Sequence, residues 1–457
     1  MVNNVIYFRD KELEKLDEFL NSNKKALSIY GRRRTGKTQL ILEAMRRNEN
    51  RRIIYYQCTA YDYNMCLGDF LTTVSSFFPD DSIITSLKSF RDLFTYLSRT
   101  NAPVDAIVID EFPFLAKRND NVPAEFQWII DHGLGNLRLI LLGSNLSFMK
   151  KQINDREAPL YGRFDEIIEV RPFTFSEVNS LFPDFEDAVN VYAQTGGVAQ
   201  YVMFYKGYNS VHEAQTALFF DRNGRLFQEA NNTLLQEVRD TSTYVLILRA
   251  IGGSEKDSGQ IASKCGIDQR GVYSYLNKLL DLEIIAEVNN PLSEKKKDRR
   301  YRISDLLFRF NYTFIEPNAS MITAIGEKAE PYVLGTKYSE YLGFVYEDII
   351  RSAMYEYALS GKIPFMPETV GKWWGSVCEG GSWSEGEIDI AAFDSKNIIL
   401  GECKFRTKAA GMKELDSLKL KAQFVPVNGR RVYYLIASKS GFTADLQAMA
   451  EDLILIK

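Results

Sequence analysis

The feature that most constrains the fold is a glycine-rich segment near the start of the chain. Residues 31–38 read Gly-Arg-Arg-Arg-Thr-Gly-Lys-Thr, which matches the pattern GxxxxGK[ST] between a strand-like run that ends at Tyr30 and a helix-forming run. In such a loop the backbone N–H groups turn inward around phosphate oxygens, the lysine supplies a cation to the β and γ phosphates, and the threonine can bind Mg²⁺. The segment therefore predicts a nucleotide site with ATP and Mg²⁺ as cofactors. Its contact residues would be Gly31, Arg34, Thr35, Gly36, Lys37 and Thr38.

Further positions along the chain fit a site that splits ATP. An apolar strand ends in Asp110 and Glu111, where Asp110 would bind Mg²⁺ and Glu111 would polarise the attacking water. A later strand ends just before Ser144, whose side chain would contact the γ phosphate, although a plain polar turn is the alternative. Arg163 precedes the next strand and could neutralise charge that develops during phosphoryl transfer. It could act within its own subunit or on a neighbour, and the second case requires a homo-oligomer.

The first half of the chain alternates apolar runs with amphipathic stretches, which is typical of a mostly parallel sheet covered by helices. After residue 172 the pattern turns helical throughout. We therefore expect an ATPase core at 1–171 and a helical lid at 172–239. The expected strands of the core are residues 26–30, 52–58, 106–109, 137–142 and 166–170.

Taken together, these motifs resemble the archaeal-type ATPases of the AAA and STAND superfamily, which also occur in bacteria. The shared segments are Gly-Arg-Arg-Arg-x-Gly-Lys-Thr, Ile-Asp-Glu-Phe, Gly-Ser, Leu-Tyr-Gly-Arg and the Thr-Gly-Gly of 195–197, spread over roughly residues 5–235. The resemblance implies a P-loop NTPase with a helical lid that binds and hydrolyses ATP. Lys11 stands where the family usually has arginine, and Ala199 where proline is typical. The second departure bears on the coupling of the lid to the nucleotide rather than on binding.

Residues 240–316 predict a winged helix-turn-helix: two helical runs flank a short turn, and an alternating hairpin with a polar tip follows. Twelve basic and nine acidic side chains give residues 241–312 a net charge of +3, against −4 for the whole chain. Cations in the wing suit contacts to DNA phosphates. The alternative is a solvated hairpin in a module for protein docking. The candidate DNA-binding residues are Arg270, Lys278, Lys295, Lys296, Lys297, Arg299 and Arg300.

After a connector at 317–337, the block 338–457 contains two alternating runs that read as neighbouring strands. The first carries Asp389, and the second carries Glu402 and Lys404 on one face. Paired strands would bring the two carboxylates together as oxygen ligands for Mg²⁺ or Mn²⁺, and Glu347 on an upstream helical run would add a ligand. Lys404 could orient or deprotonate a water that attacks a phosphodiester.

The order of these elements resembles the PD-(D/E)xK nuclease fold of restriction endonucleases and Holliday-junction resolvases. It also resembles the uncharacterised C-terminal domain that often follows archaeal-type ATPases. The resemblance implies a metal-dependent DNA nuclease with Asp389, Glu402 and Lys404 as its site, whose activity the residues alone leave open. Three tryptophans nearby either stack on bases or fill the core: Trp373, Trp374 and Trp383.

The amino-acid composition limits which partners, bound metals and cellular compartments are expected. With 56 basic and 60 acidic side chains, any contact to nucleic acid needs a local basic patch rather than overall attraction. The five cysteines and two histidines are scattered, which excludes a disulfide framework and a zinc cluster and favours a reducing compartment. No apolar run of about 18 residues occurs, so we expect a cytoplasmic protein with no membrane contact.

The sequence thus predicts an α/β P-loop NTPase with a mostly parallel sheet and a helical lid, followed by a winged helix and a restriction-endonuclease-like α/β domain. We expect an ATP-binding and ATP-hydrolysing switch that couples its nucleotide state to a DNA-binding winged helix and a Mg²⁺-dependent nuclease-like domain. Two alternatives stay open: a nucleotide-gated DNA-binding regulator, and a protein scaffold, each with a catalytically idle nuclease fold.

Overall fold

The computed structural model describes residues 7–59, 62–100, 102–116, 119–238, 240–293, 299–449 and 452–457. The chain forms two compact units: one comprises Met1–Glu177 and Gly197–Met203, and the other comprises Val178–Gly196 and Phe204–Lys457. Residues 172–239, expected as a lid, are largely helical, and the two units share them. None of the helices in the described part of the chain combines the length and the hydrophobicity that crossing a bilayer requires.

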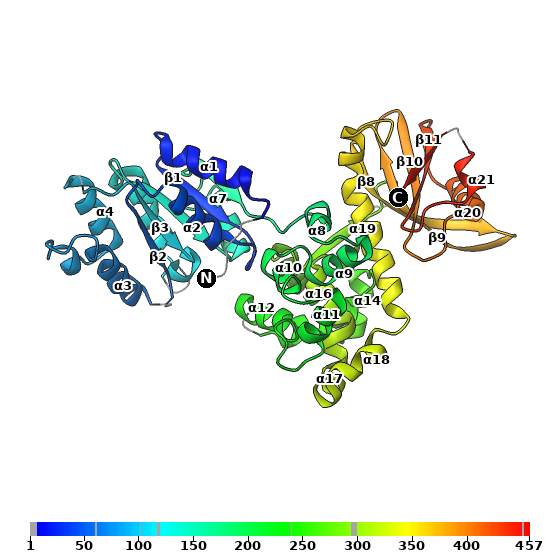
Figure 1. Cartoon of the computed structure of the whole chain (residues 1–457), viewed down its shortest axis with the longest axis horizontal. Helices are drawn as coiled ribbons and strands as arrows, with labels where there is room; N and C mark the ends of the chain where they lie inside the picture. The colour runs from blue at the N-terminus through cyan, green and yellow to red at the C-terminus, as the bar shows by residue number, and fades with distance from the viewer. Residues whose placement is uncertain are drawn as a thin grey trace. The chain divides into compact units, whose positions relative to one another are not determined.

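The first unit is built on a five-stranded sheet in the order β2-β3-β4-β1-β5, with every neighbouring pair parallel (Figure 1, blue to cyan). This confirms the predicted parallel sheet, and no strand end differs from expectation by more than one residue. The carboxyl ends of parallel strands meet at one edge of a sheet, where ligands commonly bind. The strands are β1 (Ala26–Tyr30), β2 (Ile53–Gln57), β3 (Ala106–Asp110), β4 (Arg138–Gly143) and β5 (Glu166–Glu169).

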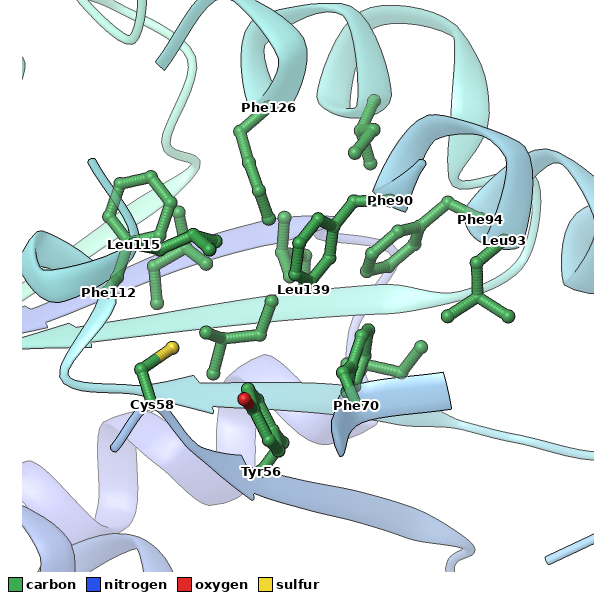
Figure 2. Close-up of a cluster of buried hydrophobic side chains, with 14 of the residues drawn as sticks. Tyr56, Cys58, Phe70, Phe90, Leu93, Phe94, Phe112, Leu115, Phe126 and Leu139 are labelled. Atoms are coloured by element: carbon green, nitrogen blue, oxygen red, sulfur yellow. The ribbon is translucent and has the colours of Figure 1, made fainter. Parts of the chain in front are cut away.

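Helices cover both faces of this sheet because alternate strand residues point to opposite sides. Leu16 and Ile41, from α1 and α2, pack on one face with Val108 of β3. On the other face lies an aromatic cluster in which Phe90 and Phe126 pack at 5.5 Å between ring centroids (Figure 2). The helices are α1 (Asp10–Asn21), α2 (Lys37–Arg47), α3 (Tyr63–Ser75), α4 (Phe90–Arg99), α5 (Phe112–Ala116), α6 (Val122–Trp128) and α7 (Leu146–Asn154). Helices α8 (Phe175–Leu181) and α10 (Ala199–Tyr205) contain residues of both units.

The second unit begins with helices, and the segment expected as a winged helix-turn-helix follows them. The elements of that segment follow the expected order: α13 (Ser242–Ile251), α14 (Ser258–Cys265), α15 (Gln269–Asp281), then the antiparallel strands β6 (Ile285–Asn289) and β7 (Arg299–Ile303). They share one apolar cluster that includes Ile261, Leu276 and Tyr301. Residues 317–337, expected as a connector, are helical over much of their length. The other helices are α9 (Phe185–Thr195), α11 (Val211–Phe219), α12 (Glu229–Glu237), α16 (Leu306–Phe310), α17 (Ala319–Ile325) and α18 (Glu330–Leu334).

The chain ends in a separate mixed sheet in the order β12-β11-β10-β9-β8, and this confirms the predicted second α/β region. Two apolar clusters lie on its faces, one with residues of α20 and the other with residues of α19. Trp373 and Trp374 are buried, whereas Trp383 is 68% exposed. The elements are α19 (Lys337–Leu359), β8 (Thr369–Glu379), β9 (Ser382–Phe393), β10 (Asn397–Lys404), α20 (Met412–Ala422), β11 (Arg431–Ser438), α21 (Ala444–Gln447) and β12 (Leu453–Ile456).

Candidate functional site

The glycine-rich segment forms the loop between β1 and α2. Gly36 caps α2 with φ of 98°, a left-handed conformation that favours glycine. A Cβ on Gly31 would lie 2.2 Å from a backbone oxygen, so this position also requires glycine. Lys37 is 6% exposed, and its Nζ donates to the carbonyls of Gly31 at 2.9 Å and Arg32 at 2.7 Å. Burial lowers the pKa of Lys37 to about 8, against the opposing charges of Glu111 and Asp110.

The two predicted Mg²⁺ ligands of this unit meet at the carboxyl edge of the sheet. The Thr38 hydroxyl donates to Asp110 Oδ2 at 2.7 Å, and the Tyr55 hydroxyl donates to the same oxygen at 2.8 Å. Asp110 is 1% exposed. Mg²⁺ prefers one or two hard protein oxygens together with phosphates and water, so Thr38 and Asp110 fit this ion. Tyr55 was not expected from the sequence, although it lies on β2, which pairs with the strand of Asp110.

Glu111, the candidate base, is hydrogen-bonded to Ser144, the candidate contact to the γ phosphate. The Ser144 hydroxyl is 2.7 Å and 2.8 Å from the two carboxylate oxygens of Glu111. Glu111 has φ of 56°, which is uncommon for a residue with a side chain and is found preferentially at functional positions. If a ligand oxygen accepts the hydrogen bond from the Ser144 hydroxyl instead, the Glu111 carboxylate becomes able to accept a proton from water.

The loop is also fixed by side chains that the sequence analysis did not single out. Arg34 donates to Gln200 Oε1 at 2.9 Å, and the Gln200 N–H donates to the Arg34 carbonyl at 3.1 Å. Arg9 is buried and donates to the carbonyls of Thr35 at 3.1 Å and Arg171 at 2.6 Å. Arg163, which was expected to neutralise charge on the phosphates, makes none of these described contacts with the loop.

Arg163 has a different partner in the described part of the chain. Its Nε donates to Asp131 Oδ2 at 3.1 Å, and its Nη1 donates to the Tyr161 carbonyl at 3.0 Å. These contacts hold the guanidinium beside the π-helical turn Ile129–Gly133 rather than at the phosphate loop. Its proposed role in phosphoryl transfer therefore stays a prediction.

In the C-terminal sheet, a β-bulge carries Asp389. Gly371 of β8 pairs with Ala391 of β9, whereas Trp373 pairs with Ile388, so two residues of β9 lie opposite the single residue between them. Those two residues are Asp389 and Ile390. Ile388 and Ala391 therefore pack in the same apolar cluster although they are three positions apart. Bulges commonly redirect a side chain beside a functional site.

The neighbouring strand brings Glu402 and Lys404 to this position. Asp389 Oδ2 accepts the N–H of Cys403 at 2.8 Å. Burial raises the pKa of Asp389 to about 7, and the charge of Glu402 adds to this. The two oxygens of Glu402 face two ammonium groups, Lys404 Nζ at 2.6 Å and Lys421 Nζ at 3.2 Å. Lys421, on α20, was missed because only the tertiary fold brings it there.

The third predicted ligand, Glu347, lies on α19. Burial raises its pKa to about 9, with the charge of Asp389 as the second cause. Arg351 lies 3.6 Å from Glu347 and donates to the Asp389 carbonyl at 2.7 Å. Among the described residues, no group of three or more His, Cys, Asp or Glu side chains is arranged to hold a metal ion. This arrangement does not fit the Mg²⁺ expected at Asp389, Glu402 and Glu347, because the Glu402 oxygens already face lysines.

The candidate DNA-binding residues fall into three groups. On α15, Arg270 is exposed and Lys278 is partly buried. Lys295, Lys296 and Lys297 lie outside the described residues. In the hairpin, Arg299 pairs with Glu287 at 3.0 Å, and Arg300 pairs with Glu385. The two hairpin arginines thus already have acidic partners.

Comparison with known proteins agrees with this architecture. Residues 7–207 match the family described as "ATPase domain predominantly from Archaea", and residues 311–415 match the family described as "Archaea bacterial proteins of unknown function". An uncharacterized protein of Methanocaldococcus jannaschii is 30% identical over 456 residues, covering 94% of this chain and 95% of that protein.

A solved structure shares the fold of a large part of the chain. The Walker-type ATPase PABY2304 of Pyrococcus abyssi is similar with a TM-score of 0.51 and 22% identity, covering 67% of this chain and 96% of that one. The ORC2 protein of Aeropyrum pernix aligns with a TM-score of 0.46 and 14% identity over 70% of this chain and 97% of its own. The full-length match and the two family matches together show that the chain belongs to the archaeal-type ATPase family, as a member whose ATPase domain is followed by a C-terminal domain of unknown function.

Proposed function

We propose that this ATPase is a switch that couples its nucleotide state to DNA binding by the helix-turn-helix segment and to the nuclease-like C-terminal domain. The observation that carries the ATPase part is the meeting of Thr38 with Asp110 and of Ser144 with Glu111 at one edge of the parallel sheet. The same edge holds the buried ammonium of Lys37.

Each of these side chains has a chemical role in the proposed reaction. Lys37 leaves the loop carbonyls to bind β and γ phosphate oxygens, which replace them as acceptors. Thr38 and Asp110 would hold Mg²⁺, which would neutralise charge on the phosphates. Glu111 accepts the proton of the attacking water once Ser144 turns its hydroxyl from the carboxylate to the γ phosphate. Loss of that phosphate after hydrolysis lets Ser144 return to Glu111, which provides two states of the site.

Replacing Glu111 with glutamine tests this assignment. The amide cannot accept the proton, so we expect ATP to bind with little change while turnover falls by about two to four orders of magnitude. The measurement is phosphate release under single-turnover conditions, with nucleotide binding followed by calorimetry. Glu125, an acidic residue of α6 outside the loop, provides a matched Glu→Gln control. Full turnover by the Glu111 variant would refute the assignment.

The DNA-binding part is supported by the exposed position of Arg270 on α15 and by the positive charge of the segment. The first turn of a second helix in a helix-turn-helix commonly faces the major groove. We therefore propose that α15 contacts duplex DNA. Arg270→Ala should weaken binding of a fluorescent duplex, and an unchanged affinity would remove α15 from the interface.

For the C-terminal domain, the lysines that face Glu402 favour a second candidate, a nuclease fold that is catalytically idle in this arrangement. Incubating the protein with linear, circular and single-stranded DNA and Mg²⁺ or Mn²⁺, with and without ATP, separates the two. Cleavage that is lost in Asp389→Ala selects the nuclease, and a mobility shift without cleavage selects the regulator. The absence of both selects a protein scaffold.

A further inference from the structure

The hairpin of the helix-turn-helix segment docks on the C-terminal sheet within the second unit. We call residues 285–293 and 299–303 the wing, and β8 with β9 the C-terminal hairpin. The buried amide of Asn290 donates to the Trp374 carbonyl at 2.7 Å. The guanidinium of Arg300 lies 4.7 Å from the Trp374 ring centroid and pairs with Glu385 of β9. The wing therefore uses its own arginine to bind the sheet.

Deeper in the same interface, ion pairs fix the base of the wing. Arg302 at the end of β7 pairs with Asp348 of α19, and Arg309 of α16 lies 3.2 Å from the same carboxylate. Glu255, before α14, lies 2.7 Å from Lys372 of β8. These contacts come from the helix-turn-helix segment and its neighbour α16 on one side and from the C-terminal domain on the other.

The ion pairs that join the wing and its neighbour α16 to the C-terminal domain differ in burial, and the degree of burial decides which pair can break and form with another ion. The side chains of Arg309 and Asp348 are 6% and 19% exposed, whereas those of Arg300 and Glu385 are 27% and 63% exposed. A buried pair is costly to break because it leaves an uncompensated charge. An exposed pair contributes little and exchanges readily with solvent ions. The base of the wing is therefore fixed, and its contact at Arg300 is releasable.

A phosphate offers Arg300 the same chemistry as Glu385. A guanidinium binds phosphate oxygens and carboxylate oxygens through the same fork of N–H donors, so the two anions compete for one site. While Arg300 Nη2 donates to Glu385, the guanidinium cannot present all of its N–H donors to a DNA phosphate.

We propose that the C-terminal hairpin masks the wing: Glu385 competes with DNA phosphates for Arg300 and so limits the affinity of the wing for DNA. This inference rests on the proposed DNA-binding function and adds its regulation. The residue that sets the affinity belongs to the C-terminal domain, so a movement of that hairpin would change DNA binding without any change in the helix-turn-helix segment.

The test compares Glu385→Gln with Glu379→Gln in the full chain, by fluorescence anisotropy with a labelled duplex of about 20 base pairs at several salt concentrations. Both glutamates are exposed on the C-terminal hairpin, so each substitution removes one negative charge from the same surface. We expect Glu385→Gln to tighten binding about two- to fivefold at low salt, as expected for an exposed ion pair. The plot of log affinity against log salt should steepen by about 0.9, the value for one added phosphate contact. Glu379→Gln should change the affinity less than 1.5-fold.

A second background separates masking from general electrostatics. In Arg300→Ala, the Glu385→Gln effect should vanish, because no guanidinium is left to release. Equal effects of the two glutamate variants, or an effect that persists without Arg300, would overturn the masking while leaving DNA binding intact. If wild type and all variants fail to bind the duplex, the proposed DNA-binding function is wrong, and the proposal that Glu385 masks the wing is then wrong as well.

Discussion

Replacing Asp348 with asparagine should destabilise the second unit by about 3 kcal/mol at pH 7. The Asp348 carboxylate is 19% exposed and contacts three guanidiniums, those of Arg302, Arg309 and Arg351, of which Arg309 is the most buried. Asparagine keeps one acceptor oxygen but removes the charge. Three partly buried cations then remain without their shared counterion. Removing one partner of a buried pair typically costs about 3–5 kcal/mol, and the retained acceptor oxygen favours the lower end.

The effect of this substitution should depend on pH in a defined direction. Burial alone would raise the pKa of Asp348, but Arg302, Arg351 and Arg309 outweigh it and hold the pKa well below its usual range. A depressed pKa in the fold contributes stability that is fully present above the unfolded-state pKa of about 3.9 and is lost as the pH falls below it. The difference between wild type and Asp348→Asn should therefore be constant between pH 5 and pH 7 and shrink below about pH 4.

Urea unfolding followed by tryptophan fluorescence suits the measurement because Trp373, Trp374 and Trp383 lie in the second unit, as three of the four tryptophans of the chain. Calorimetry should give a Tm about 6–12 °C lower, from about 2–4 °C per kcal/mol for a domain of this size. Glu340→Gln, an exposed acidic position on the same helix, should stay within about 0.5 kcal/mol of wild type. A loss below about 1 kcal/mol for Asp348→Asn would mean that the three arginines are adequately solvated, and the reasoning about this cluster would be wrong.

Three further outcomes are expected in the first unit. Because burial lowers the pKa of Lys37 to about 8 and phosphates favour its charged form, ATP binding should take up a proton at pH 8.5 but not at pH 7. Calorimetry in buffers of different ionisation enthalpy measures the proton uptake, and equal uptake at the two pH values would contradict the prediction. Gly197→Ala should cost at least about 2 kcal/mol, since Gly197 has φ of +73° and a Cβ would lie 2.0 Å from the Phe173 carbonyl oxygen; a Tm equal to that of wild type would disprove the clash. Tyr55→Phe removes a hydrogen bond to Asp110 and should raise the KM for MgATP about fivefold, with kcat less affected; an unchanged KM would assign Tyr55 no part in holding that carboxylate.

The parts of the fold that the sequence predicts well are those that depend on short stretches of chain. The phosphate loop needs its glycines and lysine at fixed spacing between a strand and a helix, so one segment defines it. The parallel sheet follows from the apolar runs, because strands buried on both faces are almost continuously hydrophobic. The bounds of strand β8 were not predicted, since Lys372 interrupts its apolar pattern and is buried beside Glu255, Glu387 and the Trp374 ring.

The site residues that were missed depend on contacts between distant segments. Arg9, in the segment Phe8-Arg9-Asp10-Lys11-Glu12, contacts the carbonyls of Thr35 and Arg171, and Lys421 contacts Glu402; no local pattern predicts either set of contacts. In the wing, the cations were visible in the sequence, whereas the acidic partner of Arg300 stands 85 positions later. Local charge therefore predicted a contact surface for DNA without predicting that part of it is covered.

The β-bulge at Asp389 has a consequence for how related sequences are aligned. Because β9 has one residue more than β8 between the pairs Trp373–Ile388 and Gly371–Ala391, deleting a single residue there would restore regular alternation with Ile388 and Ala391 still on one face, and would remove the irregularity that carries Asp389. Homologues that keep the carboxylate should therefore also keep the number of residues across this stretch, and gaps should gather instead at the tip near Gly380. A homologue with a one-residue deletion at the bulge should also have lost the aspartate, and a survey of such gaps would reveal whether the irregularity and the carboxylate were inherited as one unit.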